Sequence, residues 1–166
     1  MIYLRITVAT AVLALATIAN GETTSSVTSE SRDASTAYLG TSNFVVGRIG
    51  RDCLTLLNRP ETPQAFVLAW QQRNAKYLMA SQKYMGARLE EAEASGGAEK
   101  RNSVMSELTA VVKNGAESIV KSWLDRPDKN EACKFAVSLI ESGAYDVSST
   151  SPIFSELEGL VSWAQH

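Results

Sequence analysis

The side chains that could carry out chemistry are few in this chain of 166 residues. Its single histidine is His166, so a histidine-assisted nucleophile or a histidine-based zinc site lacks its central part. Neither a GxGxxG nor a GxxxxGK[ST] phosphate-binding loop occurs. These observations predict a protein that is not an enzyme and that uses no metal and no cofactor.

The densest acidic group consists of Glu90, Glu91 and Glu93. Two such carboxyl groups could in principle act as the acid and base of a hydrolase. They lie at a predicted helix end with Arg88 nearby, where nothing would raise a carboxyl pKa toward the range of a general acid. We interpret the group as a solvated charged surface, which makes a carboxylate-only hydrolase the least favoured function.

A stripe of aromatic and polar residues in the stretch 62–94 offers a different chemistry. Trp70, Tyr77 and Tyr84 recur every seventh residue, so they fall on one line of a helix. The polar residues that project within about 60° of Trp70 are Arg73, Asn74, Ser81 and Arg88.

Two interpretations of this stripe remain open. Within a core, Asn74 and Ser81 would bond to tyrosine hydroxyls or to backbone, and the arginines would extend to water. Alternatively, part of the stripe is exposed, because Trp, Tyr and Arg dominate the energetics of binding surfaces. The second interpretation predicts Trp70 mainly packed and a contact patch formed by Arg73, Tyr77, Tyr84 and Arg88.

The apolar residues that position these groups recur at helical spacing, and no alternating strand pattern occurs, so the predicted class is all-α. Thr62 and Pro63 are typical of a helix start, and the run that follows ends at Ser95-Gly96-Gly97. The other predicted helices begin near residues 42, 99, 128 and 151. Residues 42–166 are therefore predicted to form a single helical bundle of four main helices plus a short C-terminal helix, with the stretch 62–94 at its centre.

The segment before the bundle has two parts. Residues 1–21 combine Arg5, an apolar run from Ile6 to Ala19 and small residues at the end, which is typical of a secretory signal peptide. The run is too short for a membrane span, so no stable membrane insertion is expected after cleavage. Residues 22–41 are rich in Ser, Thr and charge, which predicts a flexible leader.

The two cysteines fit this predicted export. Cys53 and Cys133 both fall on core-facing helix positions, and an oxidising compartment favours a disulfide between them. The alternative is two buried free thiols that behave as small apolar residues. The predicted location is periplasmic or secreted.

Charge and pattern together limit the function. Loss of Arg5 with the signal peptide would change the formal charge from −2 to about −3, with both signs interspersed, so no nucleic-acid partner is indicated. The favoured hypothesis is an exported protein that binds a protein partner in the envelope or outside the cell, as an inhibitor, immunity protein or assembly adaptor. The main alternative is a carrier of a small apolar ligand between helices.

In size, signal peptide, all-α pattern and single disulfide, the chain resembles periplasmic immunity proteins that neutralise cell-wall-degrading effectors. This resemblance is architectural, and it assigns a role to no individual residue.

Overall fold

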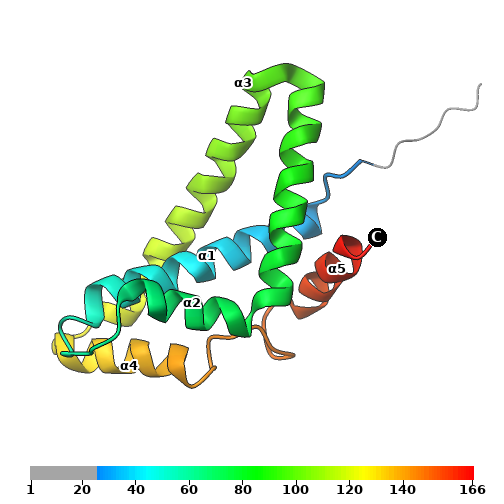
Figure 1. The fold of residues 1–166 in the computed structure, drawn as a ribbon. Coiled ribbons are helices and arrows are strands. Elements are labelled where there is room, and N and C mark those ends of the chain that lie inside the picture. Colours follow the sequence, from blue (N-terminus) through cyan, green and yellow to red (C-terminus); the bar gives the residue numbers. More distant parts are fainter. Residues whose placement is uncertain (1–25) are drawn as a thin grey trace, which may run out of the picture.

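The computed structural model describes residues 26–166, and the regular elements in that range are all helices (Figure 1). This confirms the predicted all-α class. None of the described helices is long and apolar enough to cross a membrane. The predicted signal peptide and the start of the predicted leader lie outside the described residues. The helices are α1 (Glu30–Cys53), α2 (Pro63–Arg73), α3 (Ala75–Leu124), α4 (Lys129–Glu141) and α5 (Phe154–Ala164).

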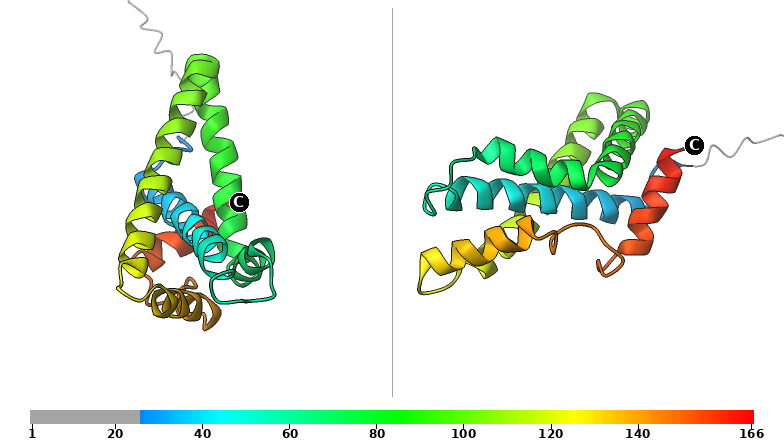
Figure 2. Two further views of the ribbon diagram at one scale, coloured as in Figure 1. Left: turned by 90° about the vertical axis from the view of Figure 1, so that its left-hand side faces the viewer. Right: turned by 60° about the horizontal axis from the view of Figure 1, so that its bottom comes forward.

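Helix α1 is the element around which the others pack, because it contacts each of the other four helices (Figure 2). It begins at Glu30, where the Ser29 hydroxyl accepts a hydrogen bond from the backbone N–H of Arg32. The prediction of a flexible leader is therefore wrong for residues 30–41, and the stretch 62–94 is not the central element. The small residues of α1 allow close helix packing: a Cβ added to Gly40 would lie 2.8 Å from Val112 Cγ2.

The predicted helix over 62–94 consists of two helices that change direction at Asn74. Its start is confirmed, because the Thr62 hydroxyl accepts a hydrogen bond from the backbone N–H of Ala65. Asn74 has φ −105° and ψ 17°, so α2 ends there and α3 begins one residue later.

The predicted break at Gly96-Gly97 is also confirmed, since Gly97 has φ +67°, which suits glycine. The break divides α3 into a first arm, residues 75–95, and a second arm, residues 98–124. The two arms meet at the glycines and diverge toward α1 (Figure 1).

The second arm is less buried than its apolar stripe predicts. Val104 is buried, and Leu108 packs beside it against the first arm. Met105 and Val111, by contrast, are 43% and 57% exposed. Only part of the apolar stripe therefore faces the core, and the buried residues of the second arm are Val104, Ala116 and Val120.

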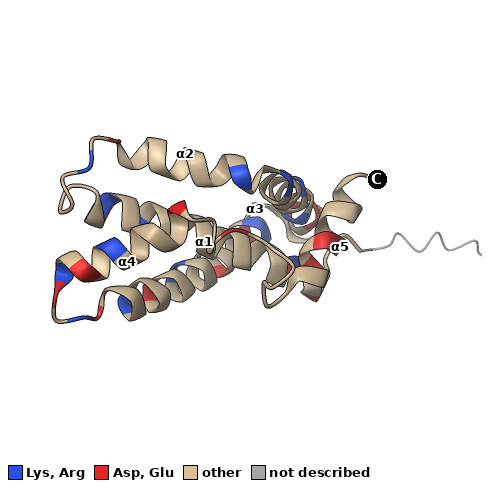
Figure 3. Ribbon diagram, turned by 90° about the horizontal axis from the view of Figure 1, so that it is seen from below, with Lys and Arg blue, Asp and Glu red and all other residues tan. Residues whose placement is uncertain are grey.

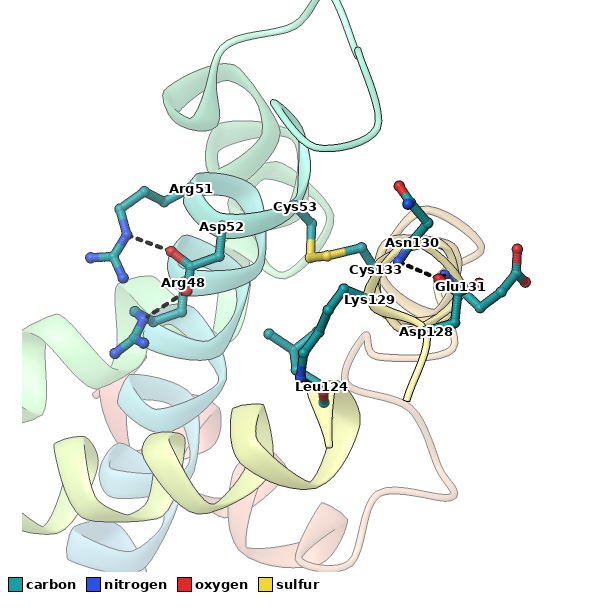
Figure 4. Close-up of a disulfide and its surroundings, with 10 residues drawn as sticks. All are labelled: Arg48, Arg51, Asp52, Cys53, Leu124, Asp128, Lys129, Asn130, Glu131 and Cys133. Atoms are coloured by element: carbon teal, nitrogen blue, oxygen red, sulfur yellow. Dashed lines mark hydrogen bonds and ion pairs between the residues drawn. A yellow bond between two sulfur atoms is a disulfide. The ribbon is translucent and has the colours of Figure 1, made fainter. Parts of the chain in front are cut away.

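A disulfide joins the C-terminal end of α1 to α4 (Figure 4). The Cα atoms of Cys53 and Cys133 are 5.2 Å apart, and both residues are buried. This confirms the predicted pairing. Helix α4 is fixed at its start by Asp128, whose carboxylate accepts hydrogen bonds from the backbone N–H groups of Asn130 and Glu131.

Candidate functional site

The aromatic stripe of the central stretch is buried. Trp70 is fully buried, Tyr84 is 1% exposed and Tyr77 is 6% exposed. Trp70 lies in the core formed with α1 and α4, whereas both tyrosines lie in a second core that includes α5. The prediction of an exposed contact patch is therefore wrong for Tyr77 and Tyr84, because neighbouring helices cover this face.

Arg73 and Asn74 belong to a network that holds the junction of α2 and α3 against the loop after α4. Arg73 Nε donates to Asp146 Oδ2 at 2.7 Å, and Arg73 Nη2 donates to the carbonyl of Ile140 at 2.6 Å. Asn74 Nδ2 donates to Asp146 Oδ1 at 3.2 Å, and Asn74 Oδ1 accepts from the backbone N–H of Val147 at 2.8 Å. These bonds stabilise the change of direction at Asn74.

Tyr84 and Arg88 belong to a different network, near the start of α1. The Tyr84 hydroxyl donates to Asp33 Oδ1 at 2.7 Å and accepts from the backbone N–H of Ser29 at 3.3 Å. Arg88 Nε lies 3.8 Å from the same Asp33 oxygen. Burial and the Asp33 carboxylate raise the pKa of Tyr84 to about 12.

Tyr77 is held separately, since its hydroxyl donates to Glu158 Oε1 at 2.5 Å. Lys76 Nζ lies 2.8 Å from the same oxygen. Burial, followed by the hydrogen bond to Glu158, raises the pKa of Tyr77. The four residues predicted to form one contact patch are thus distributed over three local networks, and each network joins two parts of the fold.

The acidic group of the first arm has a structural role at Glu91. Its carboxylate accepts hydrogen bonds from Ser26 Oγ at 2.8 Å and from the backbone N–H groups of Val27 and Thr28 at 3.0 and 3.1 Å. Bonds from the Thr28 and Ser26 hydroxyls lower the pKa of the Glu91 carboxyl. Glu90 and Glu93 are exposed. Within residues 26–166, no group of three or more His, Cys, Asp or Glu residues could hold a metal ion.

An open groove of about 360 Å³ lies at the junction of α2 and α3, and we call it the kink groove. Leu68 and Met79 lie along it and are 53% and 68% exposed. A hydrogen bond of 2.8 Å from Gln71 Nε2 to Asn43 Oδ1 joins two of its sides. No lining residue is charged. The lining residues are Leu39, Gly40, Asn43, Leu68, Gln71, Gln72, Ala75, Leu78, Met79, Ser81 and Gln82.

The change of direction at Asn74 positions this groove. Gln71 and Gln72 lie in the last turn of α2, and Ala75, Leu78 and Met79 lie in the first turns of α3. The angle between the two helices therefore fixes how these side chains are placed around the groove. Sequence reasoning did not single out Leu68 or Met79, because it treated residues 62–94 as one helix.

Comparison with known proteins assigns no function to this groove. No protein-family model, no curated protein and no solved structure matches the chain.

Proposed function

We propose that this protein is an exported helical bundle protein that binds another protein through the kink groove, as an inhibitor, immunity protein or assembly adaptor. The observation that carries the proposal is an uncharged groove with two large exposed apolar side chains, Leu68 and Met79. The centre of a protein interface is typically depleted in charge and enriched in methionine.

The side chains of the groove suit a protein segment. Met79 has a flexible thioether side chain that adapts to irregular apolar surfaces. The amide groups of Gln72 and Gln82 can donate to and accept from an exposed backbone. The groove is open to solvent, whereas a site for a small ligand usually covers most of that ligand's surface. This geometry favours the protein partner over the small apolar ligand.

The distribution of charge on the protein surface suits selective recognition of a partner. Lys and Arg are interspersed with Asp and Glu along the helices (Figure 3), whereas no residue that lines the groove is charged. Charged residues around an apolar centre are typical of interfaces that discriminate between partners. The Cys53–Cys133 disulfide and the apolar run of residues 1–21 support an exported protein.

In this proposal Arg73, Tyr77, Tyr84 and Arg88 support the contact surface and do not form it. Arg73 fixes the junction at Asn74, and the tyrosines fix the first arm against α1 and α5. Substitution of any of these four residues should therefore affect the stability of the fold more than the affinity of the folded protein for its partner.

The test uses the protein partner retained by the immobilised wild type from the envelope fraction or the medium of the source cells. The purified partner is then titrated against Leu68→Glu and Met79→Glu, which place a charge in the kink groove. Each variant should raise the Kd at least about tenfold, because an unpaired buried charge at an interface costs well over 1.4 kcal/mol.

The matched control is Val111→Glu, which changes an equally exposed apolar residue on the second arm. Its Kd should remain within about twofold of the wild type, since exposed positions outside an interface contribute little. Unchanged affinity of both groove variants would refute the kink groove as the binding surface. Weaker binding by Val111→Glu alone would move the surface to the second arm.

A further inference from the structure

The apex where the two arms of α3 meet packs against no other part of the described fold. Every residue from Glu93 to Ser103 is exposed, and Gly97 interrupts the helix there with φ +67°. The apex projects away from α1 and the remaining helices (Figure 1). Below it, the arms are held by a small cluster of buried residues, Leu89, Ala92 and Val104. A segment with so few buried contacts opens locally at low cost.

Two adjacent basic residues, Lys100 and Arg101, lie in this segment. Arg101 Nη1 is 3.4 Å from Glu93 Oε2, and both side chains are half exposed. An exposed ion pair of this kind adds little to the stability of the closed apex. A protease that selects Lys or Arg therefore finds its preferred side chains where the backbone opens most readily.

Three of the other basic residues near helix ends are poorer substrates. Arg59 and Arg126 are each followed by proline, whose ring and tertiary nitrogen block cleavage by trypsin-like proteases. The loop 142–153 contains neither Lys nor Arg. In the first turn of α1, the Arg32 guanidinium donates to the carbonyl of Val27 and lies over the ring of Trp163.

We propose that Lys100-Arg101 is a processing site at which a Lys/Arg-specific protease converts the single chain into a two-chain protein. Water adds across the peptide bond after Lys100 or Arg101, the C–N bond breaks, and a carboxylate and an amine form. The two products remain covalently joined, because Cys53 precedes the site, Cys133 follows it, and the two are disulfide-bonded.

The fold should survive this cleavage. Helix α1 lies in the N-terminal product, and it packs against the second arm, α4 and α5 in the C-terminal product. The bond that breaks lies in an exposed segment that contributes nothing to the two large cores.

Limited digestion of the full, oxidised protein with trypsin tests this proposal. The first product should be one species heavier by a single water, which runs as one band without reductant and as two bands with it. Sequencing should place the new N-terminus at Arg101 or Asn102, and the helical circular dichroism signal should match that of the intact protein. A first cut elsewhere, or loss of helical signal on cleavage, would overturn the proposal.

The matched variant is the double substitution Lys100→Gln and Arg101→Gln, which keeps good helix-forming residues at both positions. Its first cleavage should be slower by at least about tenfold, because any remaining site requires opening of a better packed region. An unchanged cleavage rate would show that the apex is not the preferred site. Fragments that separate without reductant would show that the disulfide does not join the products.

Discussion

Asn74 provides the most sensitive test of how this fold is held together. The residue is 1% exposed, and its side chain makes three hydrogen bonds. Nδ2 donates to the carbonyl of Trp70 at 2.9 Å and to Asp146 Oδ1 at 3.2 Å, and Oδ1 accepts from the Val147 N–H at 2.8 Å. Each bond contributes about 1 kcal/mol net, so Asn74→Ala should lower the free energy of unfolding by about 3 kcal/mol.

Thermal melts followed by circular dichroism would measure this loss. For a domain of this size, about 3 kcal/mol corresponds to a fall in Tm of about 10 °C. Asn74→Leu keeps the branched shape and the number of side-chain heavy atoms without the hydrogen bonds, and it should lose at least a comparable amount although it leaves no cavity.

The control for Asn74 is Gln72→Ala, an exposed change two residues away that should stay within about 0.5 kcal/mol of the wild type. If Asn74→Ala melted within about 2 °C of the wild type, a shift worth well under 1 kcal/mol, the network would not hold the junction of α2 and α3.

Three other measurements address separate parts of the fold. Reduction of the Cys53–Cys133 disulfide should lower the free energy of unfolding by about 4 kcal/mol, because a loop of 80 residues regains its closure entropy; melts with and without reductant test this. The free energy of unfolding should fall as the pH rises from 10 to about 12. The folded state keeps Tyr84 neutral up to a pKa of about 12, whereas in the unfolded state the phenol ionises near pH 10. Alkaline unfolding of Tyr84→Phe should lack this component. Val111→Asp should cost less than about 1 kcal/mol, whereas Leu108→Asp, packed against the first arm, should cost about 2 kcal/mol or more; denaturant titrations compare them.

Features set by local sequence were predicted well. Thr62 with Pro63, Asp128 with Glu131, and Gly96-Gly97 act through neighbouring backbone groups, so their effect can be inferred from the residues themselves. The Cys53–Cys133 pairing followed from there being only two cysteines, both on apolar helix faces.

Features that depend on contacts between residues far apart in the sequence were not predicted. Asn74 ends α2 while bonded to Asp146, a residue 72 positions later, and no local pattern indicates that contact. The start of α1 was predicted to be a flexible leader because residues 22–41 are rich in Ser, Thr and charge. In the fold, small residues of α1 instead allow close packing, as at Gly40 against Val112.

The candidate site shows the same limit. Helical spacing correctly placed Tyr77 and Tyr84 on one side of α3, and both are buried. Trp70 is also buried, but it belongs to α2 and lies in a different core. Spacing alone could not show which neighbours cover that side, because α5 and α1 reach it only in the folded chain. The kink groove depends on the angle at Asn74, so it could not be predicted without the network that fixes that angle.

Two exposed methionines allow a direct test of the kink groove as the binding surface. Met79 lies in the groove and is 68% exposed, and Met105 lies on the second arm and is 43% exposed. Dilute hydrogen peroxide oxidises accessible methionine to its sulfoxide, and peptide mass spectrometry measures both rates in one sample.

With saturating purified partner, the oxidation rate of Met79 should fall at least about tenfold, as expected for a side chain covered by an interface, while that of Met105 stays unchanged. Equal oxidation rates of Met79 with and without bound partner would contradict the proposed binding surface.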